Sequence, residues 1–109
     1  FAPPVLMLPS SQAIIEEVAQ SEGTIGYVGL GYVAPRVKPL GVSKSSEEPF
    51  IHPSMDTALD GSYPLARYLL FYTATEPHGI EKAFIDFDLS DEGQKIVEVM
   101  DFVPLRKSA

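Results

Sequence analysis

Few residues in this chain are of types that could do chemistry, and their spacing predicts no catalytic or metal centre. His52 and His78 each stand beside a proline, outside the H-x-x-H and H-E-x-x-H spacings of metal sites. Asp56 and Asp60 are the acids that could join them, but no regular spacing links the four side chains. The pattern therefore favours exposed histidines over metal ligands.

Nucleophilic and acid–base chemistry lack a framework as well. Cysteine is absent, which excludes disulfides, zinc–thiolate sites and thiol catalysis. Ser10 and Ser11 are not set in the G-x-S-x-G elbow of hydrolases. The acidic pairs are typical of solvated surfaces, and nothing predicts a cleft that they share; they are Glu16 with Glu17, Glu47 with Glu48, and Asp86 with Asp88. We expect a protein that is not an enzyme and holds no cofactor.

Three positions could instead face an anion, and they are our candidates for ligand binding: Ser10, Ser11 and Gly29. The two serines precede a helix predicted at residues 12–20, which follows a short apolar strand at 5–8. A helix that begins after a parallel strand directs its N–H groups toward the carboxyl edge of the sheet, where α/β proteins bind ligands. Capping of the helix is the alternative role for both serines.

Gly29 belongs to a glycine series with Gly26 and Gly31. The G-x-x-G-x-G order differs from the dinucleotide fingerprint, and no helix follows at once. The glycines therefore predict close backbone packing and a bend after the strand.

Arg67 lies in an otherwise apolar run, so its guanidinium needs a partner. An internal carboxylate is the partner that we favour, with an anion as the alternative.

The elements that would position these residues alternate between strand and helix, which predicts a mixed α/β chain. Hydrophobic periodicity and turn residues predict strands at 5–8, 24–30, 37–42 and 63–73, and helices at 12–20, 79–89 and 91–100. Residues 43–62 read as a connecting loop that holds one helical turn at 55–59.

Local signals define where the helices begin and end. Gly23 suits the stop of the first helix because glycine accepts the left-handed conformation. Ser90 can cap the last helix, where Asp91 and Glu92 suit the positive end of the helix dipole. Asp101 ends that helix and tolerates the left-handed conformation better than most residues.

Composition narrows the function. A chain of 109 residues with 45% hydrophobic residues can form one small domain or part of a larger one. The net charge of −7 argues against nucleic-acid binding, because phosphate neutralisation requires clustered Lys and Arg. No apolar run approaches the ~20 residues that span a bilayer. The opening Phe1-Ala2-Pro3-Pro4 reads as the middle of a protein, so we expect a processed or split product.

Four motifs in order resemble the C-terminal half of the periplasmic phosphate-binding proteins, which are the solute receptors of phosphate ABC importers. They are GYVG at 26–29, YPLAR at 63–67, GIEKAFIDFDLSDEGQ at 79–94 and FVPL at 102–105. The family usually has glycine where this chain has Asp101, which puts only the local turn in question.

The resemblance implies a type II periplasmic binding fold, in which two α/β lobes are joined by crossing strands. Residues 1–36 would finish the second lobe, residues 37–73 would form the crossing region with a long loop, and residues 74–109 would return to the first lobe. In the family the anion ligands come mainly from an early Ser/Thr loop, an acidic residue and an Arg…Ser-Gly-Thr helix start. None of these motifs exists in this chain.

The resemblance also implies a function and partners. The segment would bind phosphate, or a similar oxyanion, together with the missing N-terminal half, and would work with the membrane subunits of an ABC importer. Its location would be periplasmic, or extracytoplasmic and anchored at the cell surface. The alternative is a stand-alone interaction or sensor module that closes its sheet as a homodimer.

Overall fold

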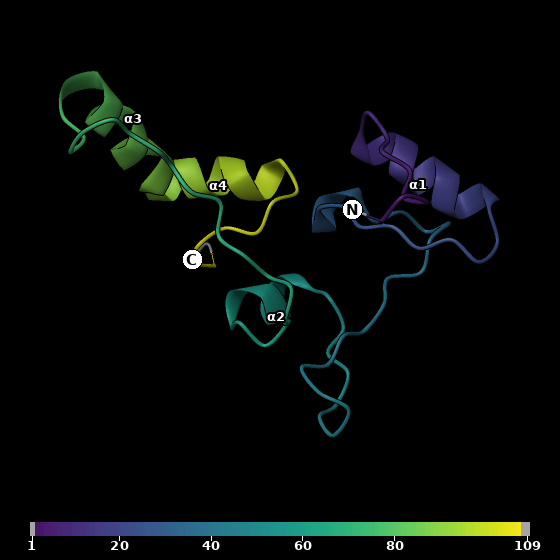
Figure 1. Ribbon diagram of the computed structural model, residues 1–109. Helices are drawn as coiled ribbons and strands as arrows, with labels where there is room; N and C mark the ends of the chain where they lie inside the picture. Colours follow the sequence, from purple (N-terminus) through teal and green to yellow (C-terminus); the bar gives the residue numbers. More distant parts are fainter. Residues whose placement is uncertain (1, 108–109) are drawn as a thin grey trace. The chain divides into compact units, whose positions relative to one another are not determined.

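The computed structural model describes residues 2–107 and contains helices joined by extended segments (Figure 1). The chain divides into two compact units, with the boundary between Pro39 and Leu40. The first unit contains helix α1 (Ser11–Gln20) and the short 3-10 turn η1 (Leu30–Tyr32). The second contains helices α2 (Met55–Leu59), α3 (Gly79–Leu89) and α4 (Asp91–Val99).

The helices predicted from the sequence are confirmed to within one residue at each end, the turn at Met55–Leu59 included. Two of the predicted caps also form. The Oγ of Ser10 accepts a hydrogen bond from the N–H of Ala13 at 3.1 Å, and the Oγ of Ser90 accepts from the N–H of Gly93 at 3.2 Å. Each bond satisfies a donor of the first helical turn that has no partner within the helix.

The predicted strands at 5–8, 24–30, 37–42 and 63–73 were wrong for this chain by itself, so the α/β class is not confirmed. Within residues 2–107 the one β-bridge is antiparallel and joins Val42 to Ile51, with N···O distances of 3.0 and 2.9 Å. Within the described part of the chain none of the other predicted segments pairs with a neighbouring strand, and Leu30 and residues 63–65 lie in turns or bends. A strand is stable only when a second strand accepts its backbone hydrogen bonds and another layer covers its side chains.

The run at 68–72 shows this most clearly. Its five side chains are all large and apolar or aromatic, and all are exposed, from 51% for Phe71 to 89% for Tyr72. One of them, Phe71, meets Phe84 of α3 edge-to-face, with ring centroids 6.2 Å apart. The segment therefore has the composition of a strand covered on both faces, while in this chain both faces are largely bare.

In the first unit, the segment after α1 packs closely on the helix. A Cβ placed on Gly26 would lie 2.8 Å from the Cγ2 of Ile14, which is too close for two carbon atoms. The backbone can therefore approach α1 this closely only because residue 26 is glycine. Ile15 is the buried side chain of α1. The close packing predicted from the glycine series is thus confirmed at Gly26.

In the second unit, α4 begins against the end of α3 with almost no space between the backbones. A Cβ on Gly93 would lie 2.2 Å from the carbonyl oxygen of Phe87 and 2.5 Å from that of Asp88. The next side chain, Gln94, is 4% exposed and extends to the segment that follows α4. That segment leaves the helix through Asp101, whose φ of 61° is the left-handed conformation expected from the sequence.

The contact at Gly93 predicts that replacing this glycine with alanine destabilises the protein. Gly→Ala inside a helix ordinarily stabilises a protein by about 1 kcal/mol, because alanine loses less backbone entropy. Gly93→Ala should instead lower the free energy of unfolding by roughly 1–3 kcal/mol, since the new methyl overlaps backbone atoms that cannot move aside. Thermal melting followed by far-UV circular dichroism measures the change. Lys95→Ala, at an exposed position of the same helix, is the control, and an unchanged or raised melting temperature for Gly93→Ala would contradict the packing described.

Candidate functional site

The candidate anion-binding residues lie in the first unit, at the starts of α1 and η1. Ser10 is the N-cap of α1, where its hydroxyl accepts from Ala13 and its carbonyl oxygen accepts from the N–H of Ile14 at 3.2 Å. Ser11 is the first residue of the helix and is half-buried. The capping alternative is therefore confirmed for Ser10. A capping hydroxyl still has its own hydrogen to donate, so this role leaves anion binding open.

Gly29 precedes η1, and its carbonyl oxygen accepts from the N–H of Tyr32 at 3.0 Å. Its φ of −61° is one that any residue can adopt, so glycine is not required there by backbone strain. Because η1 contacts α1, both candidate segments belong to one packed unit. Their chemistry is that of hydroxyl and backbone N–H donors, which can hold an oxyanion at a helix start without a cation.

An ion pair fixes the segment after η1 to the middle of α1. Arg36 bonds to the carboxylate of Glu16, which also accepts from the side-chain amide of Gln12 at 2.8 Å. These hydrogen bonds, chiefly that of Arg36, lower the pKa of Glu16 below its ordinary value. Arg36 is thus engaged with a carboxylate of its own unit.

The remaining candidates from the sequence lie in the second unit. Arg67 donates to the carbonyl oxygens of Pro64 and Ala66, at 2.9 and 2.6 Å, so the carboxylate partner expected for it was wrong. No sequence pattern could indicate these partners, because backbone carbonyl groups are present at every position. His52 and His78 are both exposed. Within the described residues 2–107, no three side chains of His, Cys, Asp or Glu are grouped as metal ligands.

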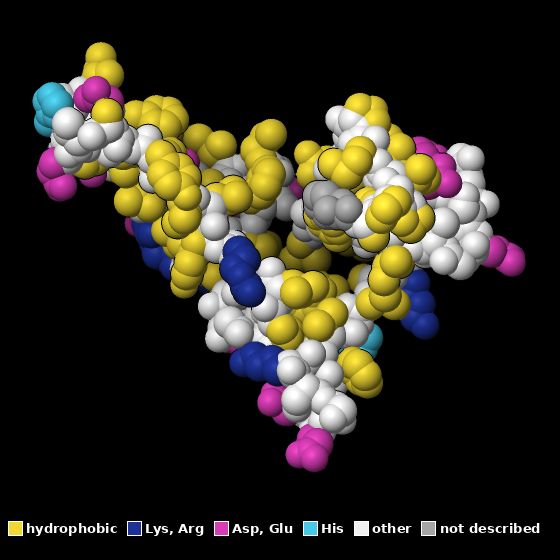
Figure 2. Space-filling model, in the orientation of Figure 1, with side chains coloured by type: hydrophobic (Ala, Val, Ile, Leu, Met, Phe, Trp, Pro, Cys, Tyr) yellow, Lys and Arg dark blue, Asp and Glu magenta, His cyan; other side chains and the backbone are white. Residues whose placement is uncertain are grey.

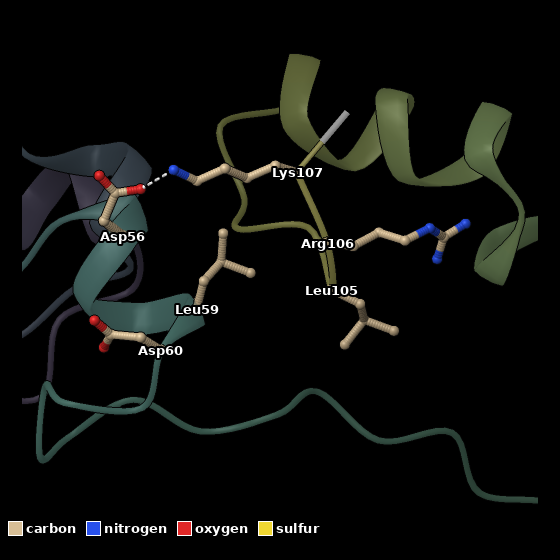
Figure 3. A pocket seen from close by; sticks show the side chains of 6 residues that line it. All are labelled: Asp56, Leu59, Asp60, Leu105, Arg106 and Lys107. Carbon is tan, nitrogen blue, oxygen red and sulfur yellow. Dashed lines mark ion pairs between the residues drawn. The ribbon is translucent and has the colours of Figure 1, made fainter. Parts of the chain in front are cut away.

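A hollow that the sequence did not predict lies between α2 and the segment after α4 (Figure 3). Its volume is about 440 Å³, and its lining residues are Asp56, Leu59, Asp60, Leu105, Arg106 and Lys107. Lys107 and Asp56 form an ion pair at 2.6 Å, which raises the pKa of Lys107. Arg106 pairs with Asp91, also at 2.6 Å.

These pairings make the hollow a poor oxyanion site. Each of its cations already has a carboxylate partner, and Asp60 adds a further negative charge. The hydrogen bonds from Ser62 lower the pKa of Asp60, which keeps that carboxylate ionised. Sequence reasoning could not find the hollow, since Asp56 and Lys107 are distant in the chain and belong to no shared motif.

Much of the surface of each unit is hydrophobic (Figure 2). In the first unit Met7, Ile25 and Tyr27 are 74–79% exposed; in the second, Leu69, Tyr72 and Ile80 are 84–89% exposed. Monomeric soluble proteins seldom leave large contiguous apolar areas open to water. None of the helices described within residues 2–107 has the length and apolar composition needed to cross a bilayer.

The chain is similar to curated phosphate-binding proteins of bacteria. It is 34% identical to the phosphate-binding protein PstS of Pseudomonas aeruginosa, over 96% of this chain and 34% of that protein. It is 30% identical to PstS 2 of Streptococcus pneumoniae over 86% of this chain, and 29% identical to PstS of Bacillus subtilis over 88%. No family model matches the chain, and no solved structure matches it significantly.

These similarities confirm the resemblance to phosphate-binding proteins that the four motifs indicated. The chain spans about a third of the length of the curated relatives it matches, a smaller share than a half. The similarity runs through both compact units, because at least 86% of the chain is included in each of these three matches.

The Glu16–Arg36 pair predicts an acid-sensitive contact in the first unit. Because the folded-state pKa of Glu16 is lowered, the pair contributes stability above the ordinary carboxyl pKa, and this contribution is lost as the pH falls through the lowered value. Titration of the Glu16 side chain by NMR should give a midpoint below 4.5, and Arg36→Gln should move that midpoint upward. Glu16→Gln is the control in which this step disappears. An Arg36→Gln variant with an unchanged midpoint would show that the pair does not form.

Proposed function

We propose that this chain is a segment of an extracytoplasmic receptor that binds phosphate for an ABC importer and catalyses no reaction. The observation that carries the proposal is the 34% identity with the Pseudomonas aeruginosa phosphate-binding protein across 96% of this chain. Chance similarity or one shared motif would cover far less of the sequence. The other curated relatives are also described as phosphate-binding proteins, so the proposal does not depend on one relative.

The exposed apolar segments support the view that the chain functions within a longer receptor. The run at 68–72 is extended and apolar on both faces, which is the pattern of a strand inside a sheet covered by helices on both sides. A type II periplasmic binding fold would supply the neighbouring strands and the covering helices. In this proposal residues 1–36 finish the second lobe, residues 37–73 cross between the lobes, and residues 74–109 return to the first lobe.

Within such a receptor, the first unit would supply part of the phosphate site. Ser11 and the first-turn N–H groups of α1 are donors at the positive end of the helix dipole, and Gly29 adds backbone at the neighbouring turn. Phosphate has four oxygens and receives many donors in a selective site, because a donor left unpaired in a closed site is costly. The larger part of the receptor would supply the other donors.

The partners and the location follow from this role. Phosphate held between two lobes would favour their closure, and the closed form would be the one that the membrane subunits of the importer recognise. The receptor would work in the periplasm or anchored outside the cell. The stand-alone dimeric module that the sequence left open as an alternative has no support from the relatives, all of which are described as phosphate-binding proteins.

The 109-residue chain by itself should bind phosphate weakly or not at all. Micromolar affinity requires about 8 kcal/mol, whereas each hydrogen bond contributes only about 0.5–1.5 kcal/mol net and capture of the ion costs entropy. A receptor-length chain, in which this segment is joined to the remaining two thirds of the Pseudomonas aeruginosa protein, should bind with micromolar affinity or better. Isothermal titration calorimetry with phosphate, and with sulfate as a competitor, measures both samples.

Two results would count against the proposal. Micromolar binding by the 109-residue chain would mean that the site lies within this segment and needs nothing further. A joined chain that folds, as judged by a cooperative thermal transition, but does not bind phosphate would mean that this segment does not serve a phosphate receptor.

Ser11 gives a test at the level of one side chain. In the joined chain, Ser11→Ala should weaken phosphate binding about tenfold, the effect of losing roughly one hydrogen bond to a charged ligand. Ser21→Ala, which removes a hydroxyl at the other end of α1, is the matched control and should leave the affinity unchanged. Equal affinities for the Ser11→Ala variant and the parent would exclude Ser11 from the site.

A further inference from the structure

The segment at residues 103–107, here called the strap, is attached firmly to the α3–α4 pair. The N–H of Leu105 donates to the Oε1 of Gln94 at 2.6 Å, and the Nε2 of the same side chain donates to the carbonyl oxygen of Asp88 at 2.8 Å. One amide group thus joins the strap, α4 and the end of α3. Because Gln94 is 4% exposed, water cannot readily replace either partner.

Two further contacts strengthen this attachment. Pro104 is fully buried, so the strap contributes to the small core of the second unit. The guanidinium of Arg106 donates to the carboxylate of Asp91 at 2.6 Å and to the carbonyl oxygen of Leu89 at 3.0 Å. Both groups lie at the junction of α3 and α4, so Arg106 holds the strap at the same place as Gln94.

The strap reaches α2 in a different way. Across the hollow, the Nζ of Lys107 bonds to the Oδ1 of Asp56 at 2.6 Å, and within residues 2–107 this is the one ion pair between the strap and α2. The two side chains are 68% and 71% exposed. Exposed ion pairs of this kind are weak and are screened by salt.

The other charged groups that line the hollow do not compete for this contact. Asp60 accepts from the N–H of Ser62 at 2.8 Å, and Arg106 extends away from the hollow to Asp91 (Figure 3). Lys107 and Asp56 are therefore each other's partners across the hollow. Leu59 and Leu105 line the hollow too, and Leu105 is 52% exposed.

Helix α2 does not need the strap in order to keep its own shape. Ser54 and Thr57 form a capping box, in which each side chain bonds to the backbone N–H of the other residue. The hydroxyl of Thr57 also donates to the carbonyl oxygen of His52 at 2.8 Å, and its own carbonyl accepts from Tyr63 at 2.9 Å. The turn is thus closed by contacts within its own neighbourhood.

We infer that the strap is a releasable clasp, held to α3 and α4 by the buried Gln94 amide and joined to α2 across the hollow by the exposed Lys107–Asp56 ion pair. Breaking this pair separates α2 from the strap while each retains its internal structure. Because the pair is exposed and electrostatic, modest changes in ionic strength shift the balance between the joined and the separated forms. The clasp is independent of whether the chain binds phosphate, since its residues are remote from the candidate anion site in sequence and lie in the other compact unit.

Amide NMR on the uniformly ¹⁵N-labelled 109-residue chain tests this inference. Asp56→Asn should shift the amide signals of α2 and of Lys107, and hydrogen exchange in α2 should stay as in the parent because the turn is closed by its own contacts. The amides of Leu105 and Gln94 should keep their positions and exchange rates. Raising the salt concentration from 0.05 to 0.5 M, roughly a threefold shortening of the Debye length, should act on the parent like the substitution and should leave Asp56→Asn unaffected.

Asp60→Asn is the matched control, because it removes a carboxylate from the same hollow without touching Lys107. It should leave the Lys107 signal and its salt dependence as they are. Gln94→Ala should have the opposite pattern to Asp56→Asn, with loss of protection at Leu105 and throughout α4. The inference is overturned if Asp56→Asn unprotects Leu105, if Asp60→Asn produces the same shifts as Asp56→Asn, or if the parent shows no dispersed α3–α4 signals.

Discussion

The second unit depends on one amide side chain, that of Gln94. Its oxygen and nitrogen bond to backbone groups of two segments that α4 itself does not contain, the strap and the end of α3. Removal of either bond would leave a polar group without a partner in a buried position, at a cost of about 1–3 kcal/mol. That cost is large for a unit with few buried side chains, so the order of α3, α4 and the strap is tied to this contact.

The neighbouring glycine explains why the amide can reach both partners. With no Cβ at Gly93, the first turn of α4 lies against the carbonyl oxygens of Phe87 and Asp88, and this brings Gln94 within 2.8 Å of the Asp88 oxygen. Four of the five residues in the sequence SDEGQ at 90–94 therefore have a structural role. Ser90 caps the helix, Asp91 binds the arginine of the strap, Gly93 permits the close approach and Gln94 joins the segments. The sequence had indicated the cap at Ser90 and a family resemblance, and the structure adds a physical reason for Asp91, Gly93 and Gln94.

Local signals predicted the helices, and non-local requirements explain why the strands failed. The residues 79–89 carry apolar periodicity and an acid, Glu81, in the first turn, and the residues 91–99 follow the Ser90 cap with two acids in the first turn, so local sequence was enough to place each helix. The residues 68–72 carry β-forming side chains, but a strand also needs a second strand, and none pairs with it in the described chain. The hydrophobic pattern of a segment predicts that it can form a strand, but the strand forms only when a neighbouring strand is present to pair with it.

The same distinction applies to the sites. Ser10 was predictable as a cap because the cap lies three residues from the N–H that it satisfies. The guanidinium of Arg67 met carbonyl groups next to it in sequence, which no pattern of side chains could indicate. The hollow beneath the strap joins residues about 50 positions apart, and its chemistry depends on which acid pairs with which base. Contacts of that kind appear only when the fold has brought the segments together.

The chain combines short helices, exposed apolar segments and a small number of candidate anion donors, and this combination bears on its proposed role. A complete receptor would bury the apolar runs, since each exposed large side chain forfeits roughly 1.5–3 kcal/mol of hydrophobic stabilisation. It would also surround the ion with more donors than Ser11 and the first turn of α1 can offer. Both deficits would be met by the same event, the packing of this segment against the longer part of a receptor, because strands that complete a sheet also place the loops at its carboxyl edge. Folding and phosphate binding would then be completed together, because the packing that buries the apolar segments would also bring the remaining donors to the ion.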